Sequence, residues 1–214
     1  MKRAISVDKV IKGLACRLHV KVGVIAVQGD VSEHVTASER AMAELGLKGS
    51  AVYVRTPEDM NGVDRLIIPG GESTTISKLL LKSGLFELIR RRAEEGMPVM
   101  GTCAGCILMA KKGDDQVEKT HTRLLGLMNM KVDRNFYGRQ RESFEAKLKI
   151  DGVSESFRGV FIRAPAILEV WGRCVPLSRL GNEIVMARED NLLGLAFHPE
   201  LSGSTEVHSL FLRI

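Results

Sequence analysis

Residues 98–107 read Pro-Val-Met-Gly-Thr-Cys-Ala-Gly-Cys-Ile, an apolar segment that runs into a cysteine set between small residues. This pattern predicts a short strand, a tight turn with Cys103 at the bend, and the start of a helix. Gly101 and Gly105 remove side-chain bulk on either side, as in the Gly-x-Ser-x-Gly nucleophile elbow. Unpaired N–H groups at a helix start favour the thiolate form of a cysteine. The stretch therefore predicts either a cysteine nucleophile or an inert buried cysteine in a strand–helix turn.

An alternation of strands and helices surrounds this turn. The pattern predicts strands at 22–27, 51–55 and 65–68, a helix over 31–45 and a long helix from about 73 to 92. Such alternation is typical of an α/β domain with a parallel sheet and right-handed connections. Ligands of these sheets bind at the carboxyl ends of the strands, where Gln28, the Gly70-Gly71 turn and Cys103 all fall.

The second half of the chain is richer in strand patterns and ends in a helix. The expected strands are 127–132, 145–150, 159–163, 167–170, 174–180, 183–187 and 192–197, and the expected closing helix is 205–212. No repeat or linker divides the chain. We therefore expect a single domain over residues 21–214, preceded by an N-terminal extension, residues 1–20.

Composition narrows the class of protein. The chain has 214 residues, 44% of them hydrophobic and 27% charged, with a formal net charge of +5. It has no long basic run and no basic–aromatic platform, which argues against a nucleic-acid partner. No apolar run reaches the length of about 18 residues that a membrane span needs. Four cysteines in a chain of this length indicate a reducing compartment, so we expect a cytoplasmic protein.

A second candidate site follows the predicted strand 192–197. His198 and Glu200 are two residues apart, so in extended chain both side chains project to the same side. Glu200 would then accept a hydrogen bond from one imidazole nitrogen and leave the other to take the proton of Cys103. The alternative is an ordinary loop after a strand, but Cys103 at another strand end of the same sheet favours catalysis.

The turn Pro69-Gly70-Gly71-Glu72-Ser73-Thr74 is the third candidate. Two glycines after a strand leave backbone N–H groups uncovered, which suits an oxyanion hole. The P-loop pattern is missing, so a phosphate-binding loop is not supported. The simpler alternative is a strand–helix turn with Ser73 or Thr74 as N-cap, and both descriptions are compatible.

Cys103 and Cys106 also form a Cys-x-x-Cys pair at a predicted helix start. This spacing is found in thiol–disulfide oxidoreductases and in half of a zinc site. A zinc site needs further ligands, and the sequence has neither a second Cys-x-x-Cys nor a spaced Cys/His pair. The redox alternative gives no role to the Gly-Gly turn, to His198 or to Glu200.

Taken together, these features resemble the class I, triad-type glutamine amidotransferases. More specific stretches are similar to the glutaminase subunits of pyridoxal 5'-phosphate synthase. They are Ala26-Val27-Gln28-Gly29, Pro69-Gly70-Gly71-Glu72-Ser73-Thr74-Thr75, Arg134-Asn135-Phe136-Tyr137-Gly138-Arg139-Gln140, Ser143-Phe144-Glu145 and Phe161-Ile162-Arg163-Ala164-Pro165. The resemblance spans residues 21–212 and implies a three-layer α/β/α, flavodoxin-like fold with a mostly parallel central sheet.

The resemblance also implies a set of site residues. Cys103 would be the nucleophile, His198 the general base and acid, and Glu200 the residue that orients it. Backbone N–H groups of Gly71 and Ala104 would form the oxyanion hole, and Gln28 would sense a docked partner. The residues that would bind L-glutamine are Gly71, Glu72, Ser73, Arg134, Ile162 and Arg163.

The implied activity is hydrolysis of L-glutamine to glutamate and ammonia through a cysteinyl thioester, with no metal or cofactor. Ammonia would pass to a synthase subunit for vitamin B6 synthesis. Two alternatives remain open: the glutaminase of another amidotransferase, such as that of the histidine pathway, and a non-catalytic glutamine-binding module.

Three features depart from the family pattern. Cys106 stands where the family has an apolar residue, so a Cys103–Cys106 disulfide is expected to make activity depend on reductant. Residues 1–20 have no counterpart in the family, and Val20 is a candidate for the true start. The sequence ends at Ile214, inside the expected closing helix, so we expect a short or missing tail.

Overall fold

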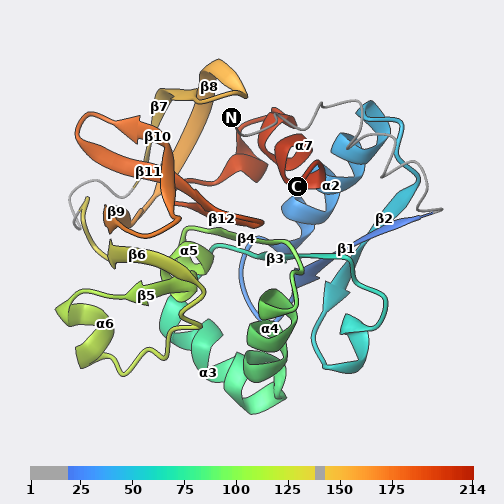
Figure 1. The fold of residues 1–214 in the computed structure, drawn as a ribbon, viewed down its shortest axis with the longest axis horizontal. Helices are drawn as coiled ribbons and strands as arrows, with labels where there is room; N and C mark the ends of the chain where they lie inside the picture. The colour runs from blue at the N-terminus through green and yellow to red at the C-terminus, as the bar shows by residue number, and fades with distance from the viewer. Residues whose placement is uncertain (1–18, 138–142) are drawn as a thin grey trace.

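The computed structural model describes residues 19–137 and 143–214, and a sheet with helices on both faces runs through them (Figure 1). The first 18 residues of the predicted N-terminal extension lie outside the described residues. So does the Gly138-Arg139-Gln140 part of the resemblance.

One half of the main sheet is entirely parallel. Its strands lie in the order β2-β1-β3-β4-β12. Their bounds are Val20–Ile25 for β1, Gly49–Val54 for β2, Arg65–Ile68 for β3, Val99–Thr102 for β4 and Leu192–Leu195 for β12. Thr102 is paired with Leu195, so the chain leaves β4 and β12 at the same sheet edge. This pairing brings together two stretches that are far apart in the sequence.

The other half of the sheet turns antiparallel beyond β12. The order continues through β11, β9 and β6, with β5 parallel to β6 at the edge and β10 paired with β11. The bounds are Ala110–Lys112 for β5, Met128–Asp133 for β6, Ala166–Val170 for β9, Val175–Leu180 for β10 and Glu183–Glu189 for β11. The expected mostly parallel central sheet is confirmed, with an antiparallel extension.

Helices cover both faces of the sheet, as Figure 1 shows. On one face lie α2 (Val31–Glu44) and α7 (Glu206–Leu212), and on the other lie α3 (Ser73–Ser83), α4 (Leu85–Glu94) and α5 (Ala104–Met109). The short elements are α6 (Asp115–Lys119), η1 (Glu58–Met60) and η2 (Pro199–Leu201). None of the helices in the described ranges has the length and apolarity to cross a bilayer.

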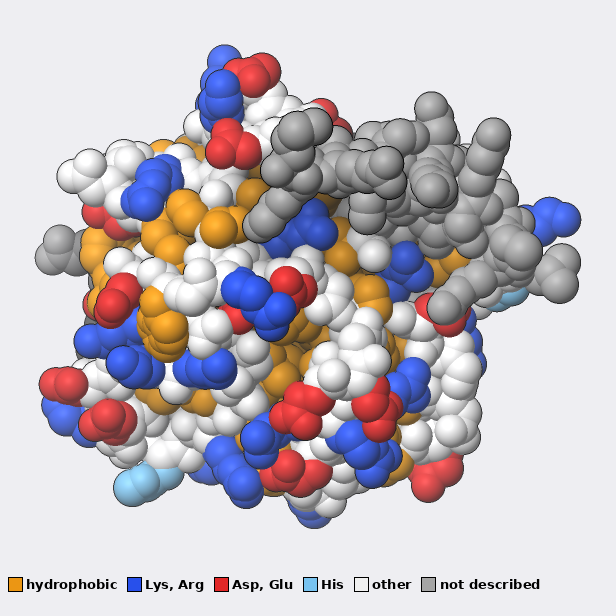
Figure 2. Space-filling model, in the orientation of Figure 1, with side chains coloured by type: hydrophobic (Ala, Val, Ile, Leu, Met, Phe, Trp, Pro, Cys, Tyr) orange, Lys and Arg blue, Asp and Glu red, His pale blue; other side chains and the backbone are white. Residues whose placement is uncertain are grey.

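Two hydrophobic cores lie on the two faces. One packs Leu80, Phe86 and Ile89 of α3 and α4 against the sheet, and the other packs Met42 of α2 and Phe211 of α7. Burying apolar surface on both faces explains why the central strands read as nearly continuous apolar runs. On the outer surface, basic and acidic side chains are interspersed over the face drawn in Figure 2.

A separate hairpin, β7 (Ser143–Ile150) with β8 (Ser154–Ile162), packs on the α7 side of the sheet (Figure 1). Phe144 and Phe161 stack with ring centroids 4.7 Å apart, and Phe161 also meets Phe197 at 5.8 Å. Phe197 directly precedes His198. The hairpin is therefore anchored through buried aromatic contacts to the segment that carries the predicted base.

The structure corrects three local predictions. The long helix expected over 73–92 is two helices, because Gly84 adopts a left-handed φ of 77° between them. The N-cap of α3 is Glu72, whose carboxylate accepts from the N–H groups of Thr74 and Thr75, rather than Ser73 or Thr74. β5 and α6 were not predicted, because three and five residues are too short to carry a readable period.

Candidate active site

Cys103 occupies a sharp bend between β4 and α5. Its backbone has φ 48° and ψ −103°, a conformation rare for a residue with a side chain, and its N–H donates to the Leu195 carbonyl at 2.8 Å. A Cβ on Gly105 would lie 2.0 Å from the Ile68 carbonyl oxygen, and one on Gly101 would lie 2.6 Å from Gly105. Only glycine fits at these two positions, so the predicted elbow is confirmed.

His198 and Glu200 meet as predicted, but by a different geometry. His198 Nδ1 lies 2.7 Å from Glu200 Oε1. The chain between them is not extended: His198 is the N-cap of the 3-10 turn η2, which folds Glu200 back onto the imidazole. The backbone N–H of His198 donates to the Val160 carbonyl of β8 at 2.8 Å. The turn and the hairpin together fix the imidazole.

Charge around His198 favours its cationic form. Burial alone would lower the pKa of the imidazole, but the carboxylates of Asp30 and Glu200 and the nearby Cys103 outweigh burial and raise the pKa to about 12. Glu200 has a completely buried side chain, and this burial raises the pKa of its carboxyl group. A cationic imidazole beside the Cys103 sulfur stabilises negative charge on that sulfur.

Asp30 is a second carboxylate at the same imidazole nitrogen, and sequence reasoning missed it. Its Oδ2 lies 3.4 Å from His198 Nδ1, and its side chain is 43% exposed. The hydrogen bond to His198 lowers the pKa of Asp30. Asp30 belongs to the turn that precedes α2, and only its place at the carboxyl end of β1 could have pointed to it.

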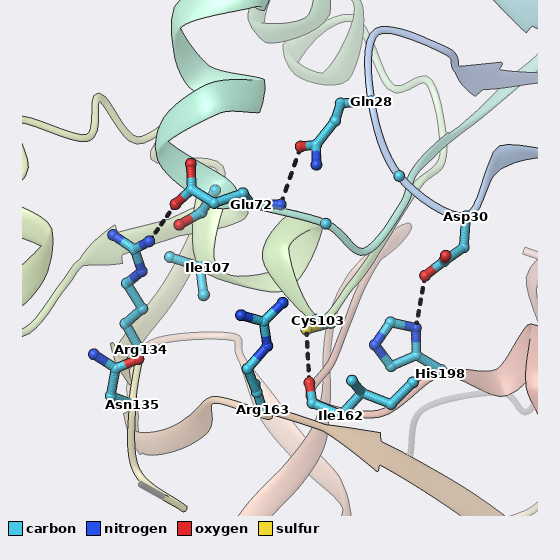
Figure 3. A pocket seen from close by; sticks show the side chains of 13 residues that line it. Gln28, Asp30, Glu72, Cys103, Ile107, Arg134, Asn135, Ile162, Arg163 and His198 are labelled. Atoms are coloured by element: carbon cyan, nitrogen blue, oxygen red, sulfur yellow. Dashed lines mark hydrogen bonds and ion pairs between the residues drawn. The ribbon is translucent and has the colours of Figure 1, made fainter. Parts of the chain in front are cut away.

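Cys103 lies at a cavity of about 310 Å³ at the carboxyl edge of the sheet (Figure 3). Its wall contains nine of the predicted site residues: Gln28, Gly71, Glu72, Ser73, Cys103, Arg134, Ile162, Arg163 and His198. Glu200 and Ala104 lie behind the wall, both buried. Sequence reasoning missed the other lining residues: Gly29, Asp30, Ile107 and Asn135.

Glu72 and Arg134 close one end of the cavity with a network of bonds. The Arg134 guanidinium pairs with the Glu72 carboxylate and donates to the Thr74 hydroxyl at 3.0 Å. The same carboxylate caps α3 through the N–H of Thr75 at 2.7 Å. Glu72 therefore links the start of α3 to Arg134, and both oxygens of its carboxylate already have hydrogen-bond partners.

Two polar atoms at the cavity have no hydrogen-bond partner among the described residues: Ser73 Oγ and His198 Nε2, both buried. A buried polar atom without a partner is costly unless a ligand or water satisfies it. Figure 3 shows the Arg163 side chain reaching into the same space near Cys103. Arg163 is exposed, has φ 42°, and has no carboxylate partner within the part of the chain that the structure describes.

Backbone at the Gly-Gly turn packs tightly around the imidazole and Gln28. The Gln28 Oε1 accepts the N–H of Glu72 at 3.0 Å. Gly71 has φ 143°, a backbone conformation that favours glycine. A Cβ on Gly70 would lie 2.4 Å from His198 Cε1. Ala104 is the first residue of α5, so its N–H has no intrahelical partner.

Two other kinds of site remain to be compared with this geometry: the redox pair or half zinc site suggested by the cysteine spacing, and a metal site at clustered ligand atoms. Cys103 and Cys106 are both free thiols, and Cys106 is completely buried. Burial, with the nearby Cys103 and Cys174, raises the pKa of Cys106. Ligand atoms of Asp30, His198 and Glu200 do lie within 4.8 Å of one another, but His198 Nδ1 and Glu200 Oε1 are 2.7 Å apart, the separation of a direct hydrogen bond.

Comparison with known proteins gives a consistent result. The SNO glutamine amidotransferase family model matches residues 24–214. The chain is 54% identical over 195 residues to "Pyridoxal 5'-phosphate synthase subunit PdxT" of Archaeoglobus fulgidus, which covers 91% of this chain and 98% of the relative. It is 51% identical, with the same coverage, to the protein of that name from Thermococcus onnurineus.

Solved structures agree with the sequence matches. A structure titled "Crystal structure of glutamine amidotransferase" superposes with a TM-score of 0.79 at 43% identity, covering 89% of this chain and 96% of that one. The glutamine amidotransferase tm1158 of Thermotoga maritima, at 16% identity and a TM-score of 0.54, shares the fold. With the family model matching nearly all of the described residues, the chain belongs to the SNO glutamine amidotransferase family.

Proposed function

We propose that this protein is the glutaminase subunit of a pyridoxal 5'-phosphate synthase and supplies ammonia for vitamin B6 synthesis. The observation that carries the proposal is the arrangement of Cys103, His198 and Glu200 at a cavity sized for a small molecule. Family membership and the names of relatives about 50% identical support the same activity.

The reaction begins with attack by the Cys103 thiolate on the carboxamide carbon of glutamine. Because Nδ1 of His198 is held by carboxylates, Nε2 is the nitrogen that faces the reaction. His198 gives its proton to the amide nitrogen, the carbon–nitrogen bond breaks, and ammonia departs. A glutamyl thioester on Cys103 remains. Neutral His198 then takes a proton from the water that attacks the thioester carbon, the carbon–sulfur bond breaks, and glutamate and the Cys103 thiolate are released. Glu200 keeps the imidazole oriented through both steps.

The negative oxygen of each tetrahedral intermediate needs hydrogen-bond donors. The backbone N–H groups of Ala104, at the start of α5, and of Gly71, in the cavity wall, are the donors that we propose. The dipole of α5 adds positive potential at the same point.

Binding of the amino-acid end of glutamine follows from charge at the cavity. Arg134 is already neutralised by Glu72, whereas Arg163 has no such partner among the described residues, so Arg163 is the residue proposed to bind the α-carboxylate. The free Ser73 hydroxyl adds a hydrogen bond, and Gly71, Glu72 and Ile162 complete the wall. The Glu72–Arg134 ion pair closes one end of the cavity.

The relatives are named as subunits, so we propose that a synthase subunit is the partner and receives the ammonia. Gln28 lies in the cavity wall and holds the N–H that follows Gly71, so it is the proposed link between partner docking and the oxyanion hole. The same proposal places the protein in the cytoplasm, where Cys103 stays reduced.

The test is glutamate release from L-glutamine by the reduced protein, alone and with the synthase subunit of the same organism, beside Cys103→Ala. We expect partner-dependent hydrolysis that the substitution abolishes. Equal hydrolysis with and without the synthase subunit would indicate that the protein is the glutaminase of another amidotransferase. No hydrolysis in either condition would leave a non-catalytic glutamine-binding module. Repeating the assay with and without reductant tests the expected Cys103–Cys106 oxidation.

A further inference from the structure

The inner oxygen of Glu200 faces a buried histidine that the reaction scheme does not use. His34, on α2, has Nε2 3.2 Å from Glu200 Oε2 and 3.1 Å from the hydroxyl of Thr102. Thr102 directly precedes Cys103. His34 is completely buried, so water cannot replace either contact. One imidazole therefore touches both the orienting carboxylate and the strand that carries the nucleophile.

A second buried histidine sets which nitrogen of His34 carries hydrogen. His208 Nε2, on α7, lies 3.1 Å from His34 Nδ1, and His208 is 1% exposed. Burial lowers the pKa of both imidazoles, that of His208 to about 4, so both are neutral at pH 7. A neutral imidazole has one donor and one acceptor nitrogen.

Hydrogen accounting leaves one consistent assignment. The cationic His198 beside Glu200 favours the carboxylate form, and a carboxylate has no hydrogen to give to His34. The hydrogen on His34 Nε2 then points to the Thr102 hydroxyl, and Glu200 Oε2, which has no hydrogen bond to a described residue, lies 3.2 Å from the same nitrogen. His34 Nδ1 must accept, and the donor is His208 Nε2. His208 Nδ1 is left as an acceptor without a partner among the described residues, which is less costly than a donor so placed.

We propose that His34 is a positioning residue of this glutaminase: its Nε2–H, which bonds the Thr102 hydroxyl, also lies 3.2 Å from the inner oxygen of Glu200 and attracts it, so that the outer oxygen stays aligned with His198. This inference rests on the proposed function, because it assigns His34 its role through the triad. His208 acts one step further out by fixing the tautomer of His34. The chain of contacts runs from α7 through α2 to Glu200 and then to His198.

The matched variants are His34→Gln and His34→Asn. Both introduce a neutral amide, but only glutamine is long enough to place an N–H donor where Nε2 stands. His34→Leu removes the donor while keeping an apolar side chain of similar bulk. Ser38→Ala, one turn along α2 and equally buried, is the control for disturbing the helix. Each is assayed for glutamate release with the synthase subunit, beside Cys103→Ala.

We expect His34→Leu and His34→Asn to lower kcat by about 10–100-fold, with KM changed less than about 3-fold. A loss of this size is typical when the hydrogen-bond partner that orients a metal-binding side chain is removed, and His34 stands in the same relation to Glu200. His34→Gln is expected to stay within about 5-fold of the original kcat, and Ser38→Ala within about 2-fold. Equal kcat values for the Gln and Asn variants would overturn the inference. Hydrolysis by Cys103→Ala would instead overturn the proposed function itself, so the two failures are distinguishable.

An independent readout needs no variant. In the complex labelled with ¹⁵N histidine, NMR correlations between ring nitrogens and carbons identify each tautomer. His34 is expected as the Nε2–H tautomer, neutral at pH 7. A hydrogen on Nδ1, or a cationic ring, would contradict the assignment even if every variant folded and lost activity.

Discussion

Two carboxylates meet one nitrogen of His198, and their surroundings differ in exposure. Glu200 lies 2.7 Å from Nδ1 with no exposed side-chain surface, whereas Asp30 lies 3.4 Å away with 43% of its side chain exposed. The buried carboxylate interacts in a low dielectric without competition from water. The exposed one is screened and exchanges with solvent. We infer that orientation comes from Glu200 and that Asp30 adjusts the charge of the imidazole.

The largest expected effect comes from replacing Glu200 by glutamine. The amide keeps the size of the side chain and its oxygen can still accept from Nδ1, but it carries no charge, so the imidazolium loses its buried countercharge. We expect kcat for glutamate release to fall about 10³–10⁴-fold, as for the orienting carboxylate of other triads. A loss below about 10-fold would show that Glu200 does not orient His198, and a thermal melt controls for folding.

Gly70→Ala tests the position of the imidazole rather than its charge. The new Cβ would stand 2.4 Å from His198 Cε1, so the ring must move although both carboxylates remain. A displacement of about 1 Å in a reacting group costs on the order of 100-fold in rate. The expected result is a kcat lowered by about that factor, with thermal stability nearly unchanged. An unaltered kcat would mean that the imidazole tolerates movement.

Asp30→Asn should have a far smaller effect on rate and a distinct effect on pH dependence. We expect kcat at pH 7 to stay within about 10-fold, because Glu200 still orients the ring. Asp30 helps to raise the pKa of His198, so removing its charge lowers that pKa and moves the alkaline limb of the kcat/KM profile to lower pH. A limb that moves to higher pH, or a loss as large as that of Glu200→Gln, would contradict the comparison.

The buried histidine His208, which contacts His34 behind Glu200, predicts a pH-dependent stability. Burial lowers the pKa of His208 from 6.5 to about 4 in the folded state. The unfolded chain therefore binds more protons between these values, and stability present above pH 6.5 is lost as the pH falls. We expect the free-energy advantage of the original protein over His208→Leu to shrink by about 2 kcal/mol from pH 7 to pH 5. Urea unfolding of both proteins at pH 7 and pH 5 measures this free-energy difference. The same difference at both pH values would refute the claim that His208 is buried in its neutral form.

The sequence predicted the parts of the site that motifs carry. Cys103 between two glycines, and His198 near Glu200, need only local patterns and their position at strand ends. The contact of His198 with Glu200 was anticipated from an extended spacing, yet η2 produces it. A two-residue spacing permits either geometry, so the pattern alone could not separate them.

Asp30 and His34 show where sequence reasoning stops. Both lie about 165 residues before the groups that they contact, and nothing in the local pattern distinguishes His34 from a core histidine on the buried face of α2. The break at Gly84 was missed because the apolar period continues through both α3 and α4. Contacts of this kind depend on how β1, β4 and β12 are ordered in the sheet, which the residues themselves do not state.

The central claim is that Cys103, oriented through His198 by Glu200, attacks glutamine. A glutamine analogue with a diazoketone in place of the carboxamide alkylates such a nucleophile, and mass spectrometry of peptides locates the label. With the synthase subunit present, we expect label on Cys103 alone, at nearly the original rate in Asp30→Asn and far more slowly in Glu200→Gln. Label on Cys106 or Cys174, or equal rates in the two variants, would contradict the account.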